Sequence, residues 1–132
     1  MRFPASDDNG ETLFGWMEYL FPINRSLTGN GNRETLKFLQ TLLPKLEIHE
    51  VKSGTKVGDW VVPGEWNPKQ AYIEDSDGNR IADFASLNLH LMGYSTPVDR
   101  WVSKSELEEH IYSIPHEPTA VPYVTSYYRR DW

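Results

Sequence analysis

The sequence predicts an α+β chain in which two N-terminal helices precede a small β-barrel or jelly-roll-like domain with one short helix. Apolar residues recur with the helical period of about 3.6 up to Pro44, and with the strand period of about 2 after it. Ser103 and Glu106 form a capping box, which marks the start of the short helix. We expect three parts: a helical pair over residues 1–45, a β domain over 46–121 and a last strand within 122–132.

The first 45 residues contain two amphipathic patterns, each ended by a proline. The first predicted helix begins near Gly10, with Asp8 or Asn9 as its N-cap, and ends at Pro22. Its apolar residues share one helical face: Leu13, Phe14, Met17, Leu20 and Phe21. The second predicted helix begins after Asn32 and ends at Pro44. Its stripe consists of leucines: Leu36, Leu39, Leu42 and Leu43.

Short alternating runs predict the strands of the β domain. The run 46–51 predicts one strand and Val57 to Val62 another. Residues 71–84 hold two apolar-polar runs around Asp77-Gly78, which is a hairpin signature because the turn requires positive φ. Residues 87–92 alternate once more and stop at Gly93.

The C-terminal part is predicted to end in a strand that needs neighbours. The short helix after Ser103 carries Leu107 and Ile111, and an extended connector with three prolines follows it. Tyr123–Tyr128 is rich in strand-forming residues. A strand of this composition usually has neighbours on both sides, and none is evident near it in the sequence.

Composition excludes several classes of protein. The 132 residues carry 13 Lys and Arg against 19 Asp and Glu, a formal charge of −6, which argues against a nucleic-acid binder. There is no cysteine, so disulfides, thiolate metal sites and a cysteine nucleophile are excluded. No stretch approaches the length of a membrane span, and the N-terminus does not resemble a signal peptide. We therefore expect a cytoplasmic protein with no membrane partner.

Motif searches find no catalytic or metal-binding constellation. The histidines lack the spacing of a helical metal pair and are interpreted as structural: His49, His90, His110 and His116. Asp75–Asn79 has its glycine at the wrong position for a calcium loop and is interpreted as a hairpin turn. Ser53-Gly-Thr-Lys56 matches the Ser-x-x-Lys of serine acylases but lacks the helical turn that this motif needs.

Two features could still bind a ligand. The loop Arg25–Gly31 places a guanidinium and two hydroxyls, those of Arg25, Ser26 and Thr28, just before a helix N-terminus, where free N–H groups attract anions or carboxylates. The alternative is that the loop only connects and caps two helices, which the spacing alone favours. The aromatic residues could stack on sugars or form the core, and the core is the commoner use: Trp60, Trp66, Tyr72, Tyr94 and Trp101.

Five phrases of the sequence stand in register with one another: Leu20–Gly31, Ile48–Val57, Asp59–Asn67, Asn88–Val98 and Ile114–Tyr128. Together they resemble one family, the bacterial and archaeal aminopeptidase-like proteins with a zinc-exopeptidase fold. The resemblance runs from about residue 11 to the end of the chain. Two departures are Asn24, where a cysteine is usual, and Gly58, where an aromatic is common and where we expect looser packing beside Trp60.

The resemblance implies a division of the chain and a function. Residues 1–45 match the opening helices of the peptidase domain, 46–121 an inserted β domain of unknown function, and Tyr123–Tyr128 the chain re-entering the peptidase sheet. A winged-helix domain follows in the family. Its zinc ligands (His, Asp and Glu) lie downstream, so none carries over to this sequence. Arg25, Ser26 and Thr28 could support the peptidase cleft.

The leading hypothesis is therefore the N-terminal portion of a zinc-dependent aminopeptidase-like protein, inactive alone. No cofactor is expected in this chain, and zinc is expected in the full-length family. The expected partner is the remainder of the peptidase domain or a second copy, with a peptide or carbohydrate as ligand. The alternative is a self-standing β-rich module that binds a carbohydrate or a protein.

Overall fold

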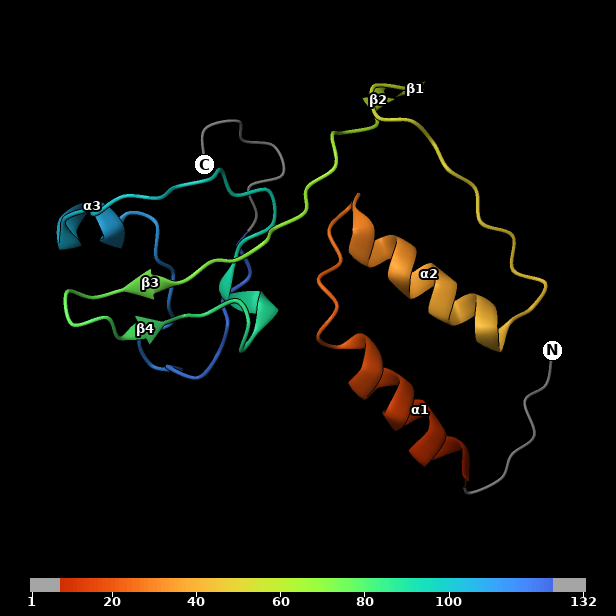
Figure 1. Ribbon diagram of the computed structural model, residues 1–132, viewed down its shortest axis with the longest axis horizontal. Helices are drawn as coiled ribbons and strands as arrows, with labels where there is room; N and C mark the ends of the chain where they lie inside the picture. The colour runs from red at the N-terminus through yellow and green to blue at the C-terminus, as the bar shows by residue number, and fades with distance from the viewer. Residues whose placement is uncertain (1–7, 125–132) are drawn as a thin grey trace. The chain divides into compact units, whose positions relative to one another are not determined.

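The computed structural model describes residues 8–124 (Figure 1). The chain divides into two compact units, residues 1–67 and 68–132, and each is described by itself. The first unit holds helices α1 and α2 and strands β1 and β2, and the second holds β3, β4, a short 3-10 helix and α3. The predicted boundaries at residues 45 and 121 stay predictions.

The two N-terminal helices form where the apolar periodicity predicts them. Helix α1 covers Asp8–Leu20 and α2 covers Asn30–Leu42, so both end shortly before the prolines expected to stop them. Gly29, with φ of 135°, is the N-cap of α2, so this helix begins three residues earlier than predicted. Tyr19 of α1 stacks on Phe38 of α2 with ring centroids 4.6 Å apart.

The apolar face of α1 is exposed to solvent. Phe14 is 60% exposed and Met17 is 67% exposed, and Leu13 and Phe21 on the same face are exposed as well. The leucine stripe of α2 is half-buried except for Leu43, which is exposed. Among the described residues, the buried hydrophobic core consists of Val62 alone, at 8% exposure.

The predicted strand from Val57 to Val62 is wrong, because the chain turns back within it. Lys56–Val57 (β1) pairs antiparallel with Trp60–Val61 (β2), and Val57 faces Trp60 across a two-residue turn. Gly58 takes a φ of 62° at the first turn position, which is the requirement of a type II′ hairpin. Gly58 therefore supplies a turn instead of a defect beside Trp60.

The predicted strand over residues 46–51 does not pair with another strand of the described chain. It runs without a turn or bend from Leu46 to Lys52 and joins α2 to the β1–β2 hairpin (Figure 1). A strand in a sheet is defined by ladder hydrogen bonds. The alternating pattern therefore coincides with a segment free of turns, but this segment is not part of a sheet.

The predicted hairpin of the second unit is confirmed. Ile73–Glu74 (β3) pairs antiparallel with Arg80–Ile81 (β4). The Asp75 carboxylate accepts hydrogen bonds from the backbone N–H groups of Asp77 and Asn79, both at 2.9 Å, and Gly78 supplies the positive φ. The Asn79 side-chain amide donates to the same carboxylate, and this bond holds the pKa of Asp75 below its ordinary value. The turn is therefore fixed by one carboxylate.

The predicted helix start at Ser103 is also confirmed, although the Glu106 carboxylate pairs with Arg100 and not with the Ser103 N–H. Two extended predictions in this unit are wrong. Ser103 Oγ accepts from the N–H of Glu106 at 3.2 Å and starts α3, Lys104–Glu108. Residues 87–92 contain the 3-10 helix Asn88–His90 instead of a strand, because the backbone of Asp83 and Leu87 accepts hydrogen bonds in successive turns.

The proline-rich connector is turned instead of extended. The N–H of Glu117 donates to the carbonyl of Ile114, and that of Ala120 donates to Glu117, each at 2.9 Å. Each turn has a proline at its second position, Pro115 and Pro118, where the fixed φ suits it. The predicted strand Tyr123–Tyr128 lies outside the described residues from position 125 on.

The mixed helix and strand content of the prediction is confirmed. The four strands of the described chain form two separate two-stranded antiparallel sheets, so the barrel or jelly roll stays a prediction. None of the helices in the described range has both the length and the apolar character needed to cross a bilayer.

Candidate functional site

The loop between α1 and α2 is the part of the sequence that was singled out as a candidate site. Arg25 Nη1 donates to the carbonyl oxygen of Leu20 at 2.6 Å, at the C-terminal end of α1. This carbonyl also accepts from the N–H of Ile23 at 3.2 Å, and a cation placed there interacts favourably with the helix dipole. The Arg25 guanidinium therefore caps α1.

The two hydroxyls of this loop bond to backbone carbonyls. Ser26 Oγ donates to the carbonyl of Thr28 and lies 3.3 Å from that of Trp66. Thr28 Oγ1 donates to the carbonyl of Gly64 at 2.9 Å. Because Gly64 and Trp66 lie almost 40 residues further along the chain, these bonds tie the loop to the segment 64–67.

The same segment caps α2. The side-chain oxygen of Asn67 accepts from the N–H of Asn30 at 2.7 Å, which satisfies one of the free donors at the helix N-terminus. Gly29 is buried between them, and a Cβ there would lie 2.8 Å from both Asn67 Oδ1 and the Trp66 carbonyl. The close approach of segment 64–67 therefore requires glycine at this position.

An ion pair completes the attachment. Arg33 on α2 donates through both terminal nitrogens to the Glu65 carboxylate, and its Nη1 lies 2.9 Å from Oε2. Its Nε lies 3.5 Å from the Glu50 carboxylate. The hydrogen bond from Arg33 holds the pKa of Glu65 below its ordinary value, and the same bond raises the pKa of Arg33. The fork geometry fixes the orientation of both groups.

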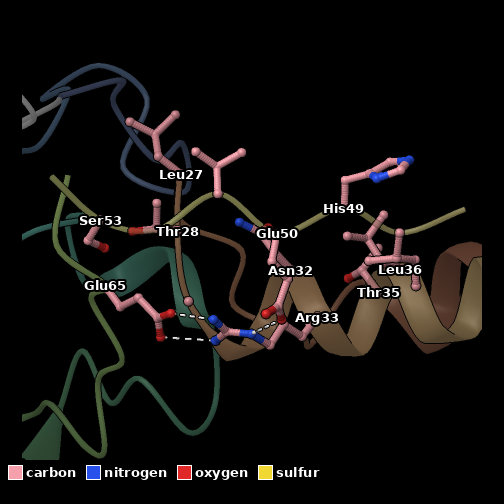
Figure 2. A pocket seen from close by; sticks show the side chains of 13 residues that line it. Leu27, Thr28, Asn32, Arg33, Thr35, Leu36, His49, Glu50, Ser53 and Glu65 are labelled. Atoms are coloured by element: carbon pink, nitrogen blue, oxygen red, sulfur yellow. Dashed lines mark hydrogen bonds and ion pairs between the residues drawn. The ribbon is translucent and has the colours of Figure 1, made fainter. Parts of the chain in front are cut away.

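A groove of about 390 Å³ lies between α2 and the segment 48–53 (Figure 2). Its apolar lining comes from Leu27, Leu36, Ile48 and Val51. Its polar lining consists of Thr28, Asn32, Arg33, Thr35, His49, Glu50, Ser53 and Glu65. Thr35 Oγ1 is buried and has no hydrogen-bond partner in the described chain. The groove thus has an apolar wall, and at its polar end Arg33 is paired with Glu50 and Glu65.

The charged residues of this groove are paired with one another. Arg33 is held by two carboxylates, and within residues 8–124 no three His, Asp or Glu side chains come together as metal ligands. His49 is exposed and lies 3.6 Å from Glu47, and His90 contacts the carbonyl of Asp83. The described residues therefore do not fit a zinc ion.

The structure brings the three predicted site residues into one loop but gives each a backbone partner. A role for Arg25, Ser26 and Thr28 beside a peptidase cleft stays a prediction. Sequence reasoning missed Glu65 and Asn67, which hold α2 from more than 30 residues away. The only local signal is that both follow the turn-forming Pro63-Gly64.

Replacing Gly31 with alanine tests how tightly this loop is packed. A Cβ at Gly31 would lie 1.8 Å from the carbonyl oxygen of Asn24, which is backbone and cannot move aside cheaply. We expect Gly31→Ala to lower the free energy of unfolding by about 1–3 kcal/mol. The matched control is Gly15→Ala, where a Cβ meets nothing within 4 Å and helix propensity favours alanine by up to about 1 kcal/mol. Urea unfolding followed by circular dichroism measures both, and shifts in the same direction would contradict the described loop.

The Arg33–Glu65 pair predicts a pH dependence of stability. A carboxyl whose folded pKa is lowered stabilises the fold above its unfolded pKa of about 4.3, and this contribution is lost as the pH falls through the folded pKa. Glu65→Gln should therefore destabilise the chain more at pH 6 than at pH 3. The control is Glu34→Gln, which removes an exposed carboxylate from α2, the helix that carries Arg33. Equal pH profiles for the two variants in urea titrations would rule out the pair.

Comparisons with known proteins identify the chain's relatives. It is 48% identical over 127 residues to a Clostridium acetobutylicum protein named "Putative polysaccharide biosynthesis protein with aminopeptidase-like domain". The match covers 96% of this chain and 29% of the relative, so the chain spans less than a third of the relative's length. A crystal structure of a "putative peptidase" from the same organism matches with a TM-score of 0.89 and 48% identity, over 95% of this chain and 29% of that one.

A family model matches the second part of the chain. It covers residues 65–132 and is described as "Domain of unknown function (DUF2172)". The match begins three residues before the second compact unit, which begins at residue 68. The chain therefore belongs to the DUF2172 family.

Proposed function

We propose that this chain is the N-terminal portion of a zinc-dependent aminopeptidase-like protein and that it has no catalytic activity without the rest of that protein. The relative that carries an aminopeptidase-like domain in its name is more than three times as long as the matched segment. The zinc ligands and the catalytic groups would come from the part of the polypeptide that this chain does not include.

The observation that carries the proposal is the exposed apolar face of α1. Phe14, Met17 and their neighbours follow the spacing of a helix that packs on a core, yet they face solvent in the described chain. Burying an apolar side chain of this size contributes roughly 1.5–3 kcal/mol. A face of this kind is typical of a domain fragment whose packing partner lies elsewhere in the protein.

In this proposal Arg25, Ser26 and Thr28 are positioning residues. Their bonds fix the end of α1 and the start of α2 relative to the segment 64–67. They would support the peptidase cleft by holding both helices in place for the remaining part of the domain.

Activity and metal content test the proposal directly. The test protein is the hybrid protein, defined as the C. acetobutylicum relative in which this chain replaces the matching segment. We expect the purified hybrid protein to contain about one zinc or more per chain and to hydrolyse aminoacyl-p-nitroanilides until a chelator is added. The 132-residue chain should bind no zinc tightly and should give no turnover.

The unmodified relative serves as the positive control for folding and assay conditions. Tight zinc binding or peptide cleavage by the 132-residue chain alone would contradict the proposal. Metal-independent turnover, or an inactive zinc-free relative, would contradict the assignment as a zinc peptidase.

A second candidate is the carbohydrate- or protein-binding module. It is favoured by Trp101, which is 73% exposed and not part of the core that sequence reasoning expected. An exposed tryptophan can stack on a sugar ring. Titration of oligosaccharides against tryptophan fluorescence, with Trp101→Ala as the control, distinguishes this candidate from the first.

A further inference from the structure

The backbone of the segment Glu47–Val51 has no hydrogen-bond partner among residues 8–124. Its neighbours are fixed, because the Leu46 N–H donates to Leu43 at 2.8 Å and the Lys52 carbonyl accepts from Thr55 at 3.1 Å. Between them, no backbone N–H or carbonyl has a hydrogen-bond partner within the part of the chain that the structure describes. The segment is also free of turns and bends. It therefore presents a row of donors and acceptors as an isolated strand would.

One face of this segment is turned toward α2. Ile48 lines the groove whose other wall includes Leu36 of α2. The Glu50 carboxylate, two residues on and therefore on the same face of a strand, lies 3.5 Å from Arg33 of that helix. Val51 would lie on the opposite face, where it is 59% exposed, and the hydrogen-bonding edges stay open.

The segment belongs with the helices and not with the second unit. The compact unit that contains α1 and α2 extends to residue 67, and the DUF2172 match begins only at residue 65. Residues 46–52 therefore share a compact unit with α1 and α2, the helices that the resemblance assigns to the peptidase domain.

We propose that residues 46–52 form a β-strand that pairs with a strand from the part of the longer polypeptide outside this chain, with α2 covering one face of the resulting sheet. The inference rests on the proposed function and adds to it the element through which the two parts join. It also moves the start of the inserted domain from residue 46 to about residue 65.

Charge argues against a second copy of the chain as the partner. An antiparallel pairing of two such segments centred between Ile48 and His49 places Glu47 opposite Glu50 twice, and like charges directly opposite each other are destabilising. The whole chain also carries a formal charge of −6, which disfavours self-association. A strand with neutral or basic side chains suits the segment better.

Hydrogen exchange read by mass spectrometry tests this pairing. In the 132-residue chain, the amides of residues 47–51 should exchange at nearly the rates of an unstructured peptide. In the hybrid protein we expect them to exchange at least about 100-fold more slowly, because ladder hydrogen bonds must open first. Equal exchange in the two proteins would overturn the proposal, as would protection in the 132-residue chain that grows with its concentration.

Proline substitutions provide a matched test that removes a single donor. His49→Pro and Glu50→Pro each delete one N–H, and these two groups point to opposite edges of a strand. His49→Ala and Glu50→Ala keep the N–H and serve as controls for the lost side chains. At least one proline variant should lower the melting temperature of the hybrid protein below that of its alanine control, with no such difference in the 132-residue chain.

The two proposals can fail separately. Slow exchange of residues 47–51 in a hybrid protein without zinc or turnover would support the strand and contradict only the catalytic proposal. Turnover by a hybrid protein in which these amides exchange freely would support the catalytic proposal and contradict only the strand. Equal melting temperatures for the proline and alanine variants would also overturn the strand.

Discussion

Removal of apolar surface from water is the largest favourable contribution to folding, and this chain achieves little of it by itself. Among the described residues, Val62 is the only buried hydrophobic side chain, whereas the apolar face of α1 is exposed. The helices are nevertheless regular and amphipathic, as expected of elements that pack against a larger core. The apolar face of α1 therefore contributes little to the stability of the described residues.

Polar contacts orient the elements of the first unit. Asn67 caps α2, Thr28 bonds to Gly64, and Arg33 forks onto Glu65. An exposed ion pair contributes at most about 1 kcal/mol to stability, so this network fixes geometry more than it adds free energy. Its members surround Gly29, where only glycine allows the segment 64–67 to approach. These contacts thus fix how the elements of the first unit are arranged but add little to its free energy of unfolding.

Local signals in the sequence predict local structure well. The N-cap at Ser103 and the hairpin at Asp75 form as expected, because every contact that defines them lies within a few residues. A glycine inside an apolar run, as at Gly58, can indicate a turn, but the run around it predicts a single strand. The attachment of Arg33 to Glu65 could not be read from the sequence, because its partners lie 32 residues apart and no periodicity links them. For the proposed strand at 46–52, the alternating pattern can be read from the sequence, but the strand that would pair with it cannot.

The central claim is that the apolar face of α1 is an internal surface of a longer protein. Hydroxyl-radical footprinting measures the solvent accessibility of Phe14 and Met17 directly, with Trp101 of the second unit as an internal reference. We expect both side chains to react fast with hydroxyl radicals in the 132-residue chain and several-fold more slowly in the hybrid protein. Equal reactivity of these two side chains in the two proteins would contradict the claim.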